Sequence, residues 1–467
     1  MPSHTVAPRP VGPASVPPRT REALITEGGR PLARADARAV LALIYLGGAA
    51  VLALWWQDTP SVSGVAGWLT NAGRITGLLA GYAVVVLLAL MARIPALERG
   101  IGTDRLARWH AMGGRYTVSL TVAHATLITW GYAVLAHRNG VAETWTLLRS
   151  YPDVLAATVA GGLLVGVGIT SVRAARARMR YETWHYLHLY TYLAVALAFS
   201  HQFSTGADFI ANTRARIVWS ALYVAVGGAL LWYRFLAPAR AFVRHQLRVT
   251  AVQREAPGIY SVLISGRHLD ELDAEPGQFF RWRFLTRDRW WAANPYSLSA
   301  PVRDGQLMRI TVKDLGDHSN GVRTLRPGTR VLAEGPYGAL TAARRTRAKV
   351  VLIAGGVGIT PLRALFETLP AQPGDLTLLY RASRATDVVF RAELDAIADT
   401  RGATVHYLTG PQHRATFTAR GLARLVPDLR HHDAYLCGPP GLTDTVHTAL
   451  RAAGVPARHI HHESFAI

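Results

Sequence analysis

The sequence predicts a multidomain membrane protein: a six-helix transmembrane bundle, then an antiparallel β-barrel domain, then an α/β domain with a parallel sheet. Three patterns support this fold class: six long apolar stretches, short alternating strands after residue 237, and a strand–glycine turn–helix pattern after residue 349. Half of the 467 residues are hydrophobic, yet the mean hydropathy is only +0.15, because apolar and water-soluble parts are averaged. The expected segments are a disordered tail, the bundle, the barrel and the α/β domain, at residues 1–38, 39–237, 245–343 and 347–467.

Each apolar stretch is about 18 to 21 residues long, enough to cross a bilayer as a helix. No stretch contains Asp, Glu or Lys, and Arg234 is the single charge, in a last turn. Six buried core helices in succession would not share this composition, so the pattern favours transmembrane helices. The stretches are 39–56, 75–92, 116–136, 154–172, 185–203 and 217–236.

The net charge of +21 comes almost entirely from arginine, placed between the apolar stretches rather than on one basic face. We therefore expect no nucleic-acid partner, and a lipid bilayer instead. Because arginine is richest before the first span and in the second and fourth loops, both termini of this multi-pass cell-membrane protein should face the cytoplasm. These arginines are Arg30, Arg34, Arg38, Arg93, Arg99, Arg105, Arg108, Arg173, Arg176, Arg178 and Arg180.

The chain has one cysteine, Cys437. A single thiol excludes a disulfide framework, an iron–sulfur cluster held by four thiolates and covalent C-x-x-C-H haem attachment. Any haem would be held by axial ligands and packing alone.

Four histidines lie in two of the apolar helices: His110 and His124 in or beside the third, His188 and His201 in the fifth. Separations of 14 and 13 residues correspond to about 20 Å along a helix. The arginine topology puts His110 and His188 near the inner face and the other two nearer the outer face. Ionisable groups at membrane depth usually mark function, and imidazole is a good haem ligand. Two matched pairs would hold two haems, one above the other.

The helical geometry leaves alternatives open. The 14-residue step keeps His110 and His124 on one face, but the 13-residue step separates His188 and His201 by about 140° on an ideal helix. A local helix irregularity or different rotamers would be needed to aim both at the third helix. His185 competes with His188, and interfacial anchoring is the alternative role for His110 and His185.

Residues 109–116 (WHAMGGRY) with His124, and residues 181–188 (YETWHYLH) with His201, resemble the ferric reductase/NADPH oxidase superfamily. The resemblance implies six helices, two b-type haems ligated from the third and fifth helices, and a cytoplasmic flavin–NADPH module. His110 with His188 would then ligate the inner haem, and His124 with His201 the outer one. Arg74 resembles an arginine near the outer haem, where it would pair with a propionate.

Residues 294–299 (NPYSLS) resemble the flavin-binding motif of ferredoxin–NADP reductase-like proteins; alone they could be a β-turn entering a strand. The resemblance implies that Tyr296 packs on the isoalloxazine and that Ser297 hydrogen-bonds near its reactive nitrogen. Residues 313–321 and 334–338 follow in the family's order, and the 316–321 loop would offer N–H groups to the pyrophosphate. The expected FAD contacts there are Lys313, His318, Ser319 and Asn320. Where the family usually has a cation, this chain has Asn294; Arg281 or Arg283 would have to replace it.

Residues 355–361 (GGVGITP) follow a strand and open a helix, as a dinucleotide-binding turn does. The turn allows close approach of phosphate to the backbone and to the helix N-terminus. Its expected contacts are Gly355, Gly356, Gly358, Thr360 and Pro361. By resemblance Cys437, Gly438 and Pro439 flank the nicotinamide; otherwise Cys437 is a small buried residue.

The preference between NADPH and NADH depends on a cation for the 2′-phosphate. Arg381 and Arg384 end the second parallel strand, where that cation belongs, so NADPH is expected; because arginine is abundant, chance placement leaves NADH possible. Residues 463–465 resemble the aromatic terminus that covers the flavin in the superfamily, and a hydrophobic plug is the alternative role of Phe465. Ser297, Cys437 and Phe465 would lie closest to the chemistry.

These patterns predict an NAD(P)H-dependent flavocytochrome b that passes electrons from NADPH through FAD and two haems to an outer small-molecule acceptor. Ferric-chelate reduction is favoured over superoxide production, because Ile128 stands where some oxygen-reducing relatives carry a further histidine. A non-enzymatic transporter with a regulatory nucleotide domain is the alternative from another class. The lack of membrane carboxylates and of an inverted repeat disfavours it. The oligomeric state is not predicted.

Overall fold

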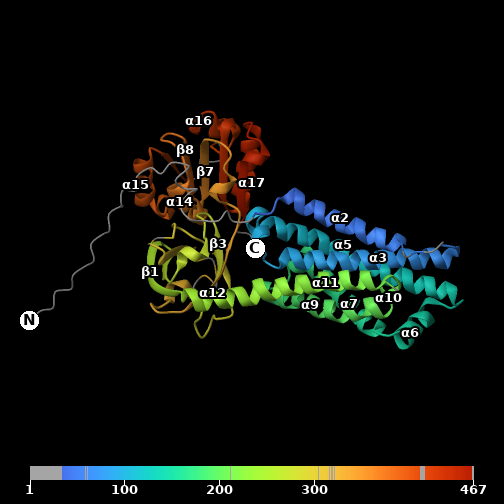
Figure 1. Cartoon of the computed structure of the whole chain (residues 1–467). Helices are drawn as coiled ribbons and strands as arrows, with labels where there is room; N and C mark the ends of the chain where they lie inside the picture. Colours follow the sequence, from blue (N-terminus) through green and yellow to red (C-terminus); the bar gives the residue numbers. More distant parts are fainter. Residues whose placement is uncertain are drawn as a thin grey trace, which may run out of the picture. The chain divides into compact units, whose positions relative to one another are not determined.

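The computed structural model describes residues 34–57, 59, 62–210, 212–302, 304–314, 316, 319, 321–410 and 416–464 (Figure 1). The expected N-terminal tail, as far as residue 33, lies outside the described residues.

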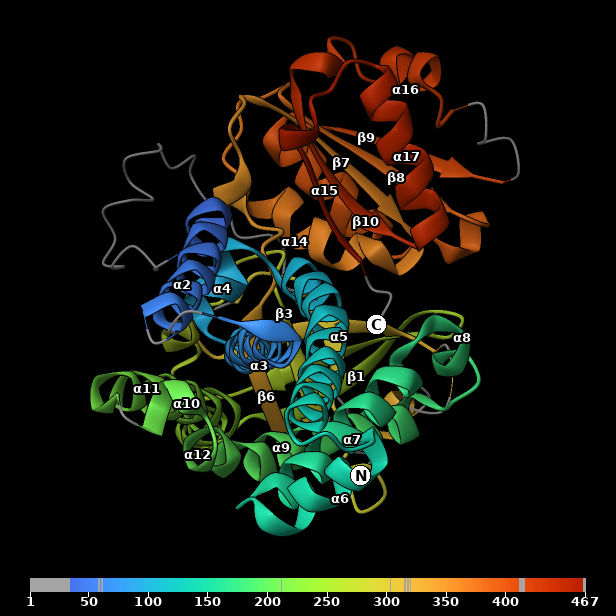
Figure 2. The same cartoon turned by 90° about the vertical axis from the view of Figure 1, so that its right-hand side faces the viewer.

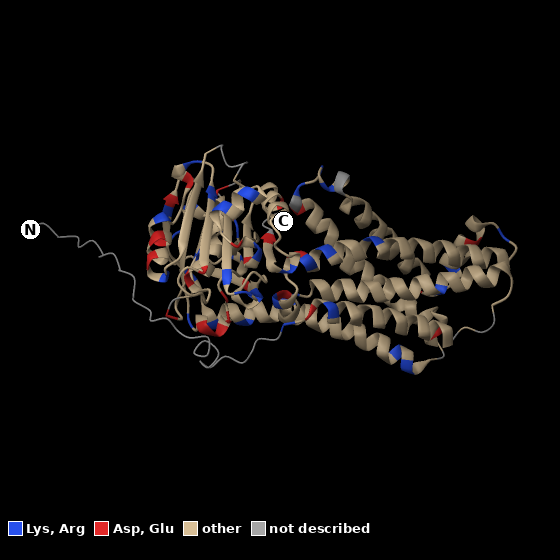
Figure 3. Cartoon of the chain, turned by 90° about the horizontal axis from the view of Figure 1, so that it is seen from above, with Lys and Arg blue, Asp and Glu red and all other residues tan. Residues whose placement is uncertain are grey.

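Five helices in the described ranges are long and apolar enough to cross a membrane. They are α2 (Ala37–Gln57), α3 (Gly64–Met91), α5 (Thr103–Leu135), α7 (Val154–Ser171) and the run Thr213–His245. Large apolar side chains on them are exposed, Tyr45 at 73% and Val224 at 72%, as expected of surfaces that face lipid. Figure 3 shows few charged residues along these helices and many of both signs on the C-terminal domains.

The predicted count of six spans is not confirmed. The expected stretch 185–203 does form a helix, α9 (Tyr181–Ser204), but it is not among the helices apolar enough to count as a span. Its three histidines and its tyrosines lower its hydropathy, whereas α2 has no histidine and one tyrosine and stays high. Short helices connect the long ones: α4 (Pro95–Gly100), α6 (Gly140–Ser150), α8 (Arg173–Arg176) and α10 (Ala207–Ile210).

Helix α3 packs along α5, and α7 packs along α9. Three glycines spaced four residues apart, Gly73, Gly77 and Gly81, give α3 a small-residue stripe. A Cβ on Gly73 would lie 2.8 Å from the Ile128 side chain, so glycine allows the backbones of α3 and α5 to approach closely.

The last long helical run connects the bundle to the first strand. It comprises α11 (Thr213–Leu231), the π-helical turn η1 (Trp232–Leu236) and α12 (Ala237–His245). Arg234, within the π-helical turn, donates from Nε to the carbonyl oxygen of Met91 at 3.1 Å. The arginine therefore bonds a carbonyl at the C-terminal end of α3, where the last carbonyls of a helix have no partner within the helix.

The next domain consists of two three-stranded antiparallel sheets. One has the order β1-β2-β5 (Arg248–Ala256, Ile259–Ser265, Leu307–Lys313), and the other the order β4-β3-β6 (Asn294–Ser297, Phe279–Phe284, Val331–Tyr337). Isolated bridges, Arg248 to Arg330 and Leu298 to Ile310, connect the two sheets. Their shared core includes the fully buried Phe280, Trp282 and Ile310. The predicted strands are present, but a closed barrel is not confirmed.

The C-terminal domain is a five-stranded parallel sheet of order β11-β10-β7-β8-β9. Its strands in chain order are β7 (Lys349–Gly355), β8 (Leu376–Ala382), β9 (Thr404–Thr409), β10 (His432–Gly438) and β11 (Ile460–Ser464). Helices α14 (Ile359–Thr368) and α15 (Arg391–Arg401) cover one face, and α16 (Ala419–Leu425) and α17 (Pro440–Ala452) the other (Figure 2). The order reverses between β7 and β10, and such a reversal is where α/β sheets bind ligands.

Candidate functional site

Helices α5 and α9 bring the four predicted histidines together as two pairs. The ring centroids of His110 and His188 are 5.9 Å apart, and those of His124 and His201 are 6.3 Å apart. The interplanar angles, 63° and 65°, are nearly equal. Two similar side-chain pairs therefore connect the same two helices at two levels.

Hydrogen bonds at Nδ1 leave the Nε2 atoms available in most of these rings. Nδ1 of His124 lies 2.8 Å from the carbonyl oxygen of Gly73, and Nδ1 of His110 lies 3.2 Å from that of Leu87. Nδ1 of His201 lies 3.0 Å from Oγ1 of Thr205. Nδ1 of His188 is buried and has no partner within the described ranges. A bond at Nδ1 fixes the tautomer in which Nε2 can bind a metal.

The pair geometry fits a haem between two imidazoles. With metal–nitrogen bonds of about 2 Å on either side, bis-histidine ligation puts the ring centroids about 6 Å apart. Among the described residues no group of three or more His, Cys, Asp and Glu could hold a metal ion. Haem iron, however, needs only two protein ligands, and each pair supplies two.

Both histidines of α9 reach α5 from one continuous helix. Residues 181–204 are α-helical throughout, so the 13-residue step is accommodated without an irregularity in the helix. The ring centroid of His185, the competitor, is 6.1 Å from that of Tyr186, whereas His188 is the residue whose ring faces His110. Of the two open alternatives, different side-chain directions account for both pairs.

Arg74 lies one residue after Gly73, the glycine whose carbonyl faces His124. Its guanidinium pairs with the buried carboxylate of Asp208, at 2.5 Å, and donates to Oδ1 of Asn71 at 3.1 Å. All three guanidinium nitrogens of Arg74 thus donate to protein groups, Nε and Nη2 to Asp208 and Nη1 to Asn71. Asp208 was not expected from the sequence, since 134 residues separate it from Arg74.

Several contacts connect the bundle to the antiparallel domain near the His110–His188 pair. The guanidinium of Arg93 lies 4.5 Å above the ring of Tyr337, and Arg344 donates to the carbonyl oxygen of Gly100 at 2.6 Å. Arg34 pairs with Glu275 at 2.5 Å. Helices α4 and α12 also pack against β6. This junction brings the N-terminal end of α5 close to the C-terminal half of the chain.

Residues 294–299, which resemble a flavin-binding motif, form strand β4 and the two residues after it. Burial raises the pKa of Tyr296 to about 12, so its phenol stays neutral. The side chain of Ser297 is buried, and its Oγ has no partner among the residues that the structure describes. A buried hydroxyl without a partner is costly, so this atom fits a bound group that would hydrogen-bond it, as the motif predicts.

The expected phosphate contacts of the flavin are only partly visible. His318 and Asn320 lie outside the described residues; Ser319 donates to the carbonyl oxygen of Gly316, and Lys313 is exposed. Of the two candidate cations, Arg283 pairs with Glu334 at 2.9 Å and Arg281 lies 3.9 Å from it. Both arginines therefore share a carboxylate in β6.

The two glycine motifs of the parallel sheet meet where the strand order reverses. A Cβ on Gly358 would overlap the carbonyl oxygen of Cys437 and lie 2.8 Å from the nitrogen of Gly438. Gly356 has a φ of +55°, and Thr360 donates to the carbonyl oxygen of Val357 at 3.0 Å. Gly355, Pro361 and Pro439 border the same turn. The structure thus brings the glycine turn and the segment after Cys437 together; their roles in dinucleotide binding stay a prediction.

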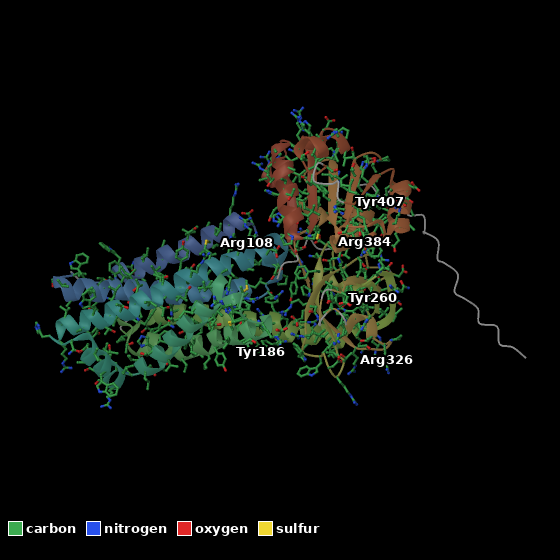
Figure 4. All side chains as sticks on the ribbon, turned by 180° about the vertical axis from the view of Figure 1, so that it is seen from behind. Arg108, Tyr186, Tyr260, Arg326, Arg384 and Tyr407 are labelled. Atoms are coloured by element: carbon green, nitrogen blue, oxygen red, sulfur yellow. The ribbon has the colours of Figure 1, made fainter. Side chains whose placement is uncertain are left out.

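The expected 2′-phosphate cations differ in surroundings. Nη1 of Arg381 is buried without a hydrogen-bond partner within the described chain. Arg384, exposed on the α/β domain (Figure 4), instead pairs with Asp387 at 3.2 Å. Nη1 of Arg381 is therefore a hydrogen-bond donor to which an anion could bind.

Cys437 and Glu463 lie side by side in β10 and β11, paired in register. Burial raises the pKa of both groups well above its usual range, and Asp104 and Glu98 raise that of Glu463 further. Cys437 therefore has a neutral thiol beside the glycine turn, and the neutral carboxyl of Glu463 lies next to Gly338. Phe465 lies outside the described residues.

Sequence reasoning missed Gly77 and Arg309. A Cβ on Gly77 would lie 2.5 Å from Nδ1 of His124, so this glycine makes room for the ring, and the four-residue glycine spacing could have revealed it. Arg309 connects residues 294–299, which resemble a flavin-binding motif, to the α/β domain through Glu393. No local pattern indicates that pair, because 84 residues separate the partners.

Comparison with known families gives the class of the chain. Residues 76–199 match the family "Ferric reductase like transmembrane component", and residues 352–448 match "Oxidoreductase NAD-binding domain". The chain is therefore similar to a ferric reductase-like transmembrane component over residues 76–199 and to an oxidoreductase NAD-binding domain over residues 352–448. This agrees with the resemblance found in the sequence.

Individual relatives match the C-terminal half. "NADPH oxidoreductase" of Mycobacterium tuberculosis is 31% identical over 231 residues, 47% of this chain and 60% of the relative. The ferredoxin reductase component of the 3-ketosteroid-9-alpha-monooxygenase of Rhodococcus rhodochrous is 30% identical over 228 residues, 47% of this chain and 64% of the relative. The chain thus spans about three fifths of the length of these relatives. The flavohem-like FAD/NAD-binding domain of the nitric oxide dioxygenase of Vibrio cholerae O1 biovar El Tor is 27% identical, with a TM-score of 0.41, covering 47% of this chain and 98% of that one.

Proposed function

We propose that this protein is a flavocytochrome b that moves electrons across a membrane, from cytoplasmic NADPH through FAD and two b-type haems to an acceptor outside. The observation that carries the proposal is the pair of histidine contacts between α5 and α9, at 5.9 and 6.3 Å. Both separations fit bis-imidazole ligation of haem iron, and ligands at two depths suit a path through the bilayer.

In this proposal the domains have distinct tasks. Residues 39–237 form a six-helix haem domain in which α9 is the fifth span, residues 245–343 bind FAD and residues 347–467 bind NADPH. When bound, FAD would accept a hydride from the nicotinamide and pass on single electrons, which is chemistry that the cofactors supply. Both termini face the cytoplasm, on the side that the arginine-rich loops favour.

The residues of the chain bind and orient these groups. Ser297 supplies a buried hydroxyl to the flavin, and Tyr296 packs a neutral ring against it. The turn at Gly355–Gly358 receives the dinucleotide phosphates. Arg381 offers its unpartnered Nη1 to the 2′-phosphate, which favours NADPH, and the name of the Mycobacterium tuberculosis relative agrees with this choice.

His110 with His188 would ligate the inner haem, and His124 with His201 the outer. Arg74 would lie near a carboxylate of the outer haem, with Asp208 and Asn71 fixing its position. Since Asp208 already balances its charge, we expect this contact to be weaker than an unshared ion pair.

We propose a ferric chelate as the acceptor. The residue at the position where oxygen-reducing relatives carry a further histidine is Ile128, and its side chain packs against Gly73 of α3 rather than offering a polar group. The family description of residues 76–199 agrees with this acceptor.

The proposal is tested with the haem-loaded full-length protein in sealed vesicles, oriented with the flavin domain outside. NADPH is added outside, a ferric chelate is enclosed, and reduced iron is measured with an enclosed ferrous indicator. We expect iron reduction that superoxide dismutase, enclosed with the chelate, does not lower.

Iron reduction that disappears when superoxide dismutase is enclosed would assign the acceptor to oxygen. Protein that shows no haem absorbance after haem loading, yet retains a folded bundle, would contradict the flavocytochrome proposal and favour a transporter.

A further inference from the structure

Arg309, on β5 of the antiparallel domain, reaches across to the α/β domain. Its guanidinium makes a bidentate contact with the carboxylate of Glu393, with Nη1–Oε1 at 2.7 Å and Nη2–Oε2 at 2.9 Å. The same guanidinium lies 4.6 Å above the ring of Phe390, at the start of α15. Only arginine offers a planar fork that also stacks on a ring. The side chain is 14% exposed, so the contact is largely shielded from water.

Other N–H groups of Arg309 donate to the segment 294–299, which resembles a flavin-binding motif. Nη2 donates to the carbonyl oxygen of Ser299 at 3.0 Å, and Nε donates to its Oγ at 3.2 Å. Ser299 is fully buried, two residues after Ser297, and Thr311 donates to its Oγ at 2.8 Å. Arg309 is thus bonded to the backbone that carries the buried hydroxyl of Ser297.

Glu393 continues the connection to the dinucleotide turn. Nε of Arg363 donates to Oε2 of Glu393 at 2.8 Å, and Arg363 also pairs with Glu367. Arg363 is 3% exposed at its side chain and lies one turn after Thr360, in the helix that the glycine turn opens. Burial opposes ionisation of Glu393, but Arg309 and Arg363 outweigh it and lower the pKa of the carboxyl, which stays charged.

We propose that Arg309, Glu393 and Arg363 form a joint that holds the dinucleotide turn at a fixed distance from the flavin-binding strand. The proposal rests on the proposed function, since the joint matters through the nicotinamide–flavin distance. Hydride transfer needs the reacting atoms about 3 to 3.5 Å apart, and a displacement of about 1 Å can cost a factor of about 100 in rate. Arg309 and Glu393 are positioning residues, because they act through Ser299 and α14 rather than on the cofactors.

The test is stopped-flow reduction of the flavin by NADPH in the full-length holoprotein. For Arg309→Met we expect the limiting rate to fall about 10- to 100-fold. The dissociation constant for NADPH should change less than about threefold, because the residues of the dinucleotide turn are intact. FAD content and reduction by dithionite should be those of the wild type. Arg309→Lys retains the charge but loses the fork, so its rate should be intermediate.

Arg244→Met is the matched control, because Arg244, on α12, also binds both carboxylate oxygens of a glutamate, Glu271 of the antiparallel domain, but at an exposed surface. Its flavin should be reduced at the wild-type rate. Glu393→Gln gives a second route if Arg309→Met does not fold, since the amide has the same shape without the charge, and it should also slow the limiting rate.

A wild-type limiting rate in folded Arg309→Met or Glu393→Gln, or a change confined to the dissociation constant, would overturn the joint. If NADPH fails to reduce the flavin of the wild-type protein, the proposed function itself is wrong, and the proposed role of the joint is wrong as well. The two failures are therefore distinguished by the wild-type trace.

Discussion

Gly358 shows how one missing side chain joins two motifs that are far apart in the sequence. Its hydrogen faces the carbonyl oxygen of Cys437 and the nitrogen of Gly438, both backbone atoms that cannot rotate away. Any side chain here must push the dinucleotide turn away from the end of β10. Glycine is therefore required here because a Cβ would collide with these atoms. Its φ is outside the left-handed region, so the backbone conformation alone does not require glycine.

We predict that Gly358→Ala slows flavin reduction by NADPH at least about tenfold, because the turn is displaced from the nicotinamide segment. The measurement is anaerobic mixing with NADPH, followed by flavin absorbance. Gly441→Ala, in the first turn of α17 with open space around its Cβ, is the control and should leave the rate unchanged. Equal rates in both variants would contradict the close-contact argument.

The buried carboxyl of Glu463 should make stability depend on pH. Its pKa is raised well above the ordinary value of about 4.3, so the folded protein binds this proton more tightly than the unfolded chain. The stabilisation is then complete below the unfolded pKa and is lost as the pH rises toward the folded pKa. Glu463→Gln stays neutral at every pH.

We therefore predict that the thermal melting temperature of Glu463→Gln, relative to wild type, rises between pH 5 and pH 8 by about 3 °C. The measurement is thermal unfolding of the holoprotein followed by flavin fluorescence. A difference that stays constant with pH would show that Glu463 is ionised or exposed in the folded protein.

At the scale of residues, the sequence predicts the partners that belong to one motif and misses those that the fold brings together. The glycine turn and the segment after Cys437 could be read locally, because each has its own pattern. Arg309 with Glu393, and Arg74 with Asp208, are 84 and 134 residues apart and have no periodic signal. Such pairs become visible only when strands and helices are placed in space.

Among the elements, α3 and α9 decide the surroundings of the histidines. Gly73 offers its carbonyl to His124, and Gly77 leaves space for the same ring. On α9 the four-turn span between His188 and His201 is regular helix. The two helices therefore shape the two sides of the His124–His201 pair.

For Gly77→Val we expect the haem content to fall from two to about one per protein, because the new side chain occupies the place of the His124 ring. The pyridine haemochrome assay measures it. Gly227→Val on α11, where nothing lies within 4 Å of the added Cβ, should retain both haems. Two full haems in Gly77→Val would contradict the role of this glycine.

At the scale of elements, the sequence predicted long helices and buried strands well, and the short or mixed elements poorly. Strand β3 belongs to the short alternating strands expected after residue 237. Strand β4 is not marked by such a pattern, because it is four residues long and contains a proline. Helix α9 has the predicted position, but its histidines and tyrosines make its membrane character ambiguous by hydropathy.

Across the whole molecule, the account requires the reductase half to deliver electrons to the bundle through their junction. Arg93 stacks on Tyr337 there, and Arg344 binds the carbonyl oxygen of Gly100. These contacts come from a loop between two spans and from strand β6 with the segment after it. The loop is rich in arginine, and one of these arginines, Arg93, takes part in the junction.

Arg93→Gln should leave flavin reduction by NADPH unchanged and slow subsequent haem reduction about tenfold, because the cation–π contact that holds β6 to the bundle is lost. Stopped-flow absorbance at flavin and haem wavelengths separates the two steps. Arg254→Gln, exposed on β1, is the control. Slowing of flavin reduction to the same degree would place Arg93 in the flavin site instead.

The central claim, that α5 and α9 hold two haems between two histidine pairs, is tested most directly by haem content and the dithionite-reduced spectrum of single variants. His124→Leu or His201→Leu should lose the outer haem, and His110→Leu or His188→Leu the inner one, each leaving about one haem per protein. His185→Leu, on the same helix, should retain two. Two full haems in all four pair variants, or loss of one in His185→Leu with both retained in His188→Leu, would contradict the account.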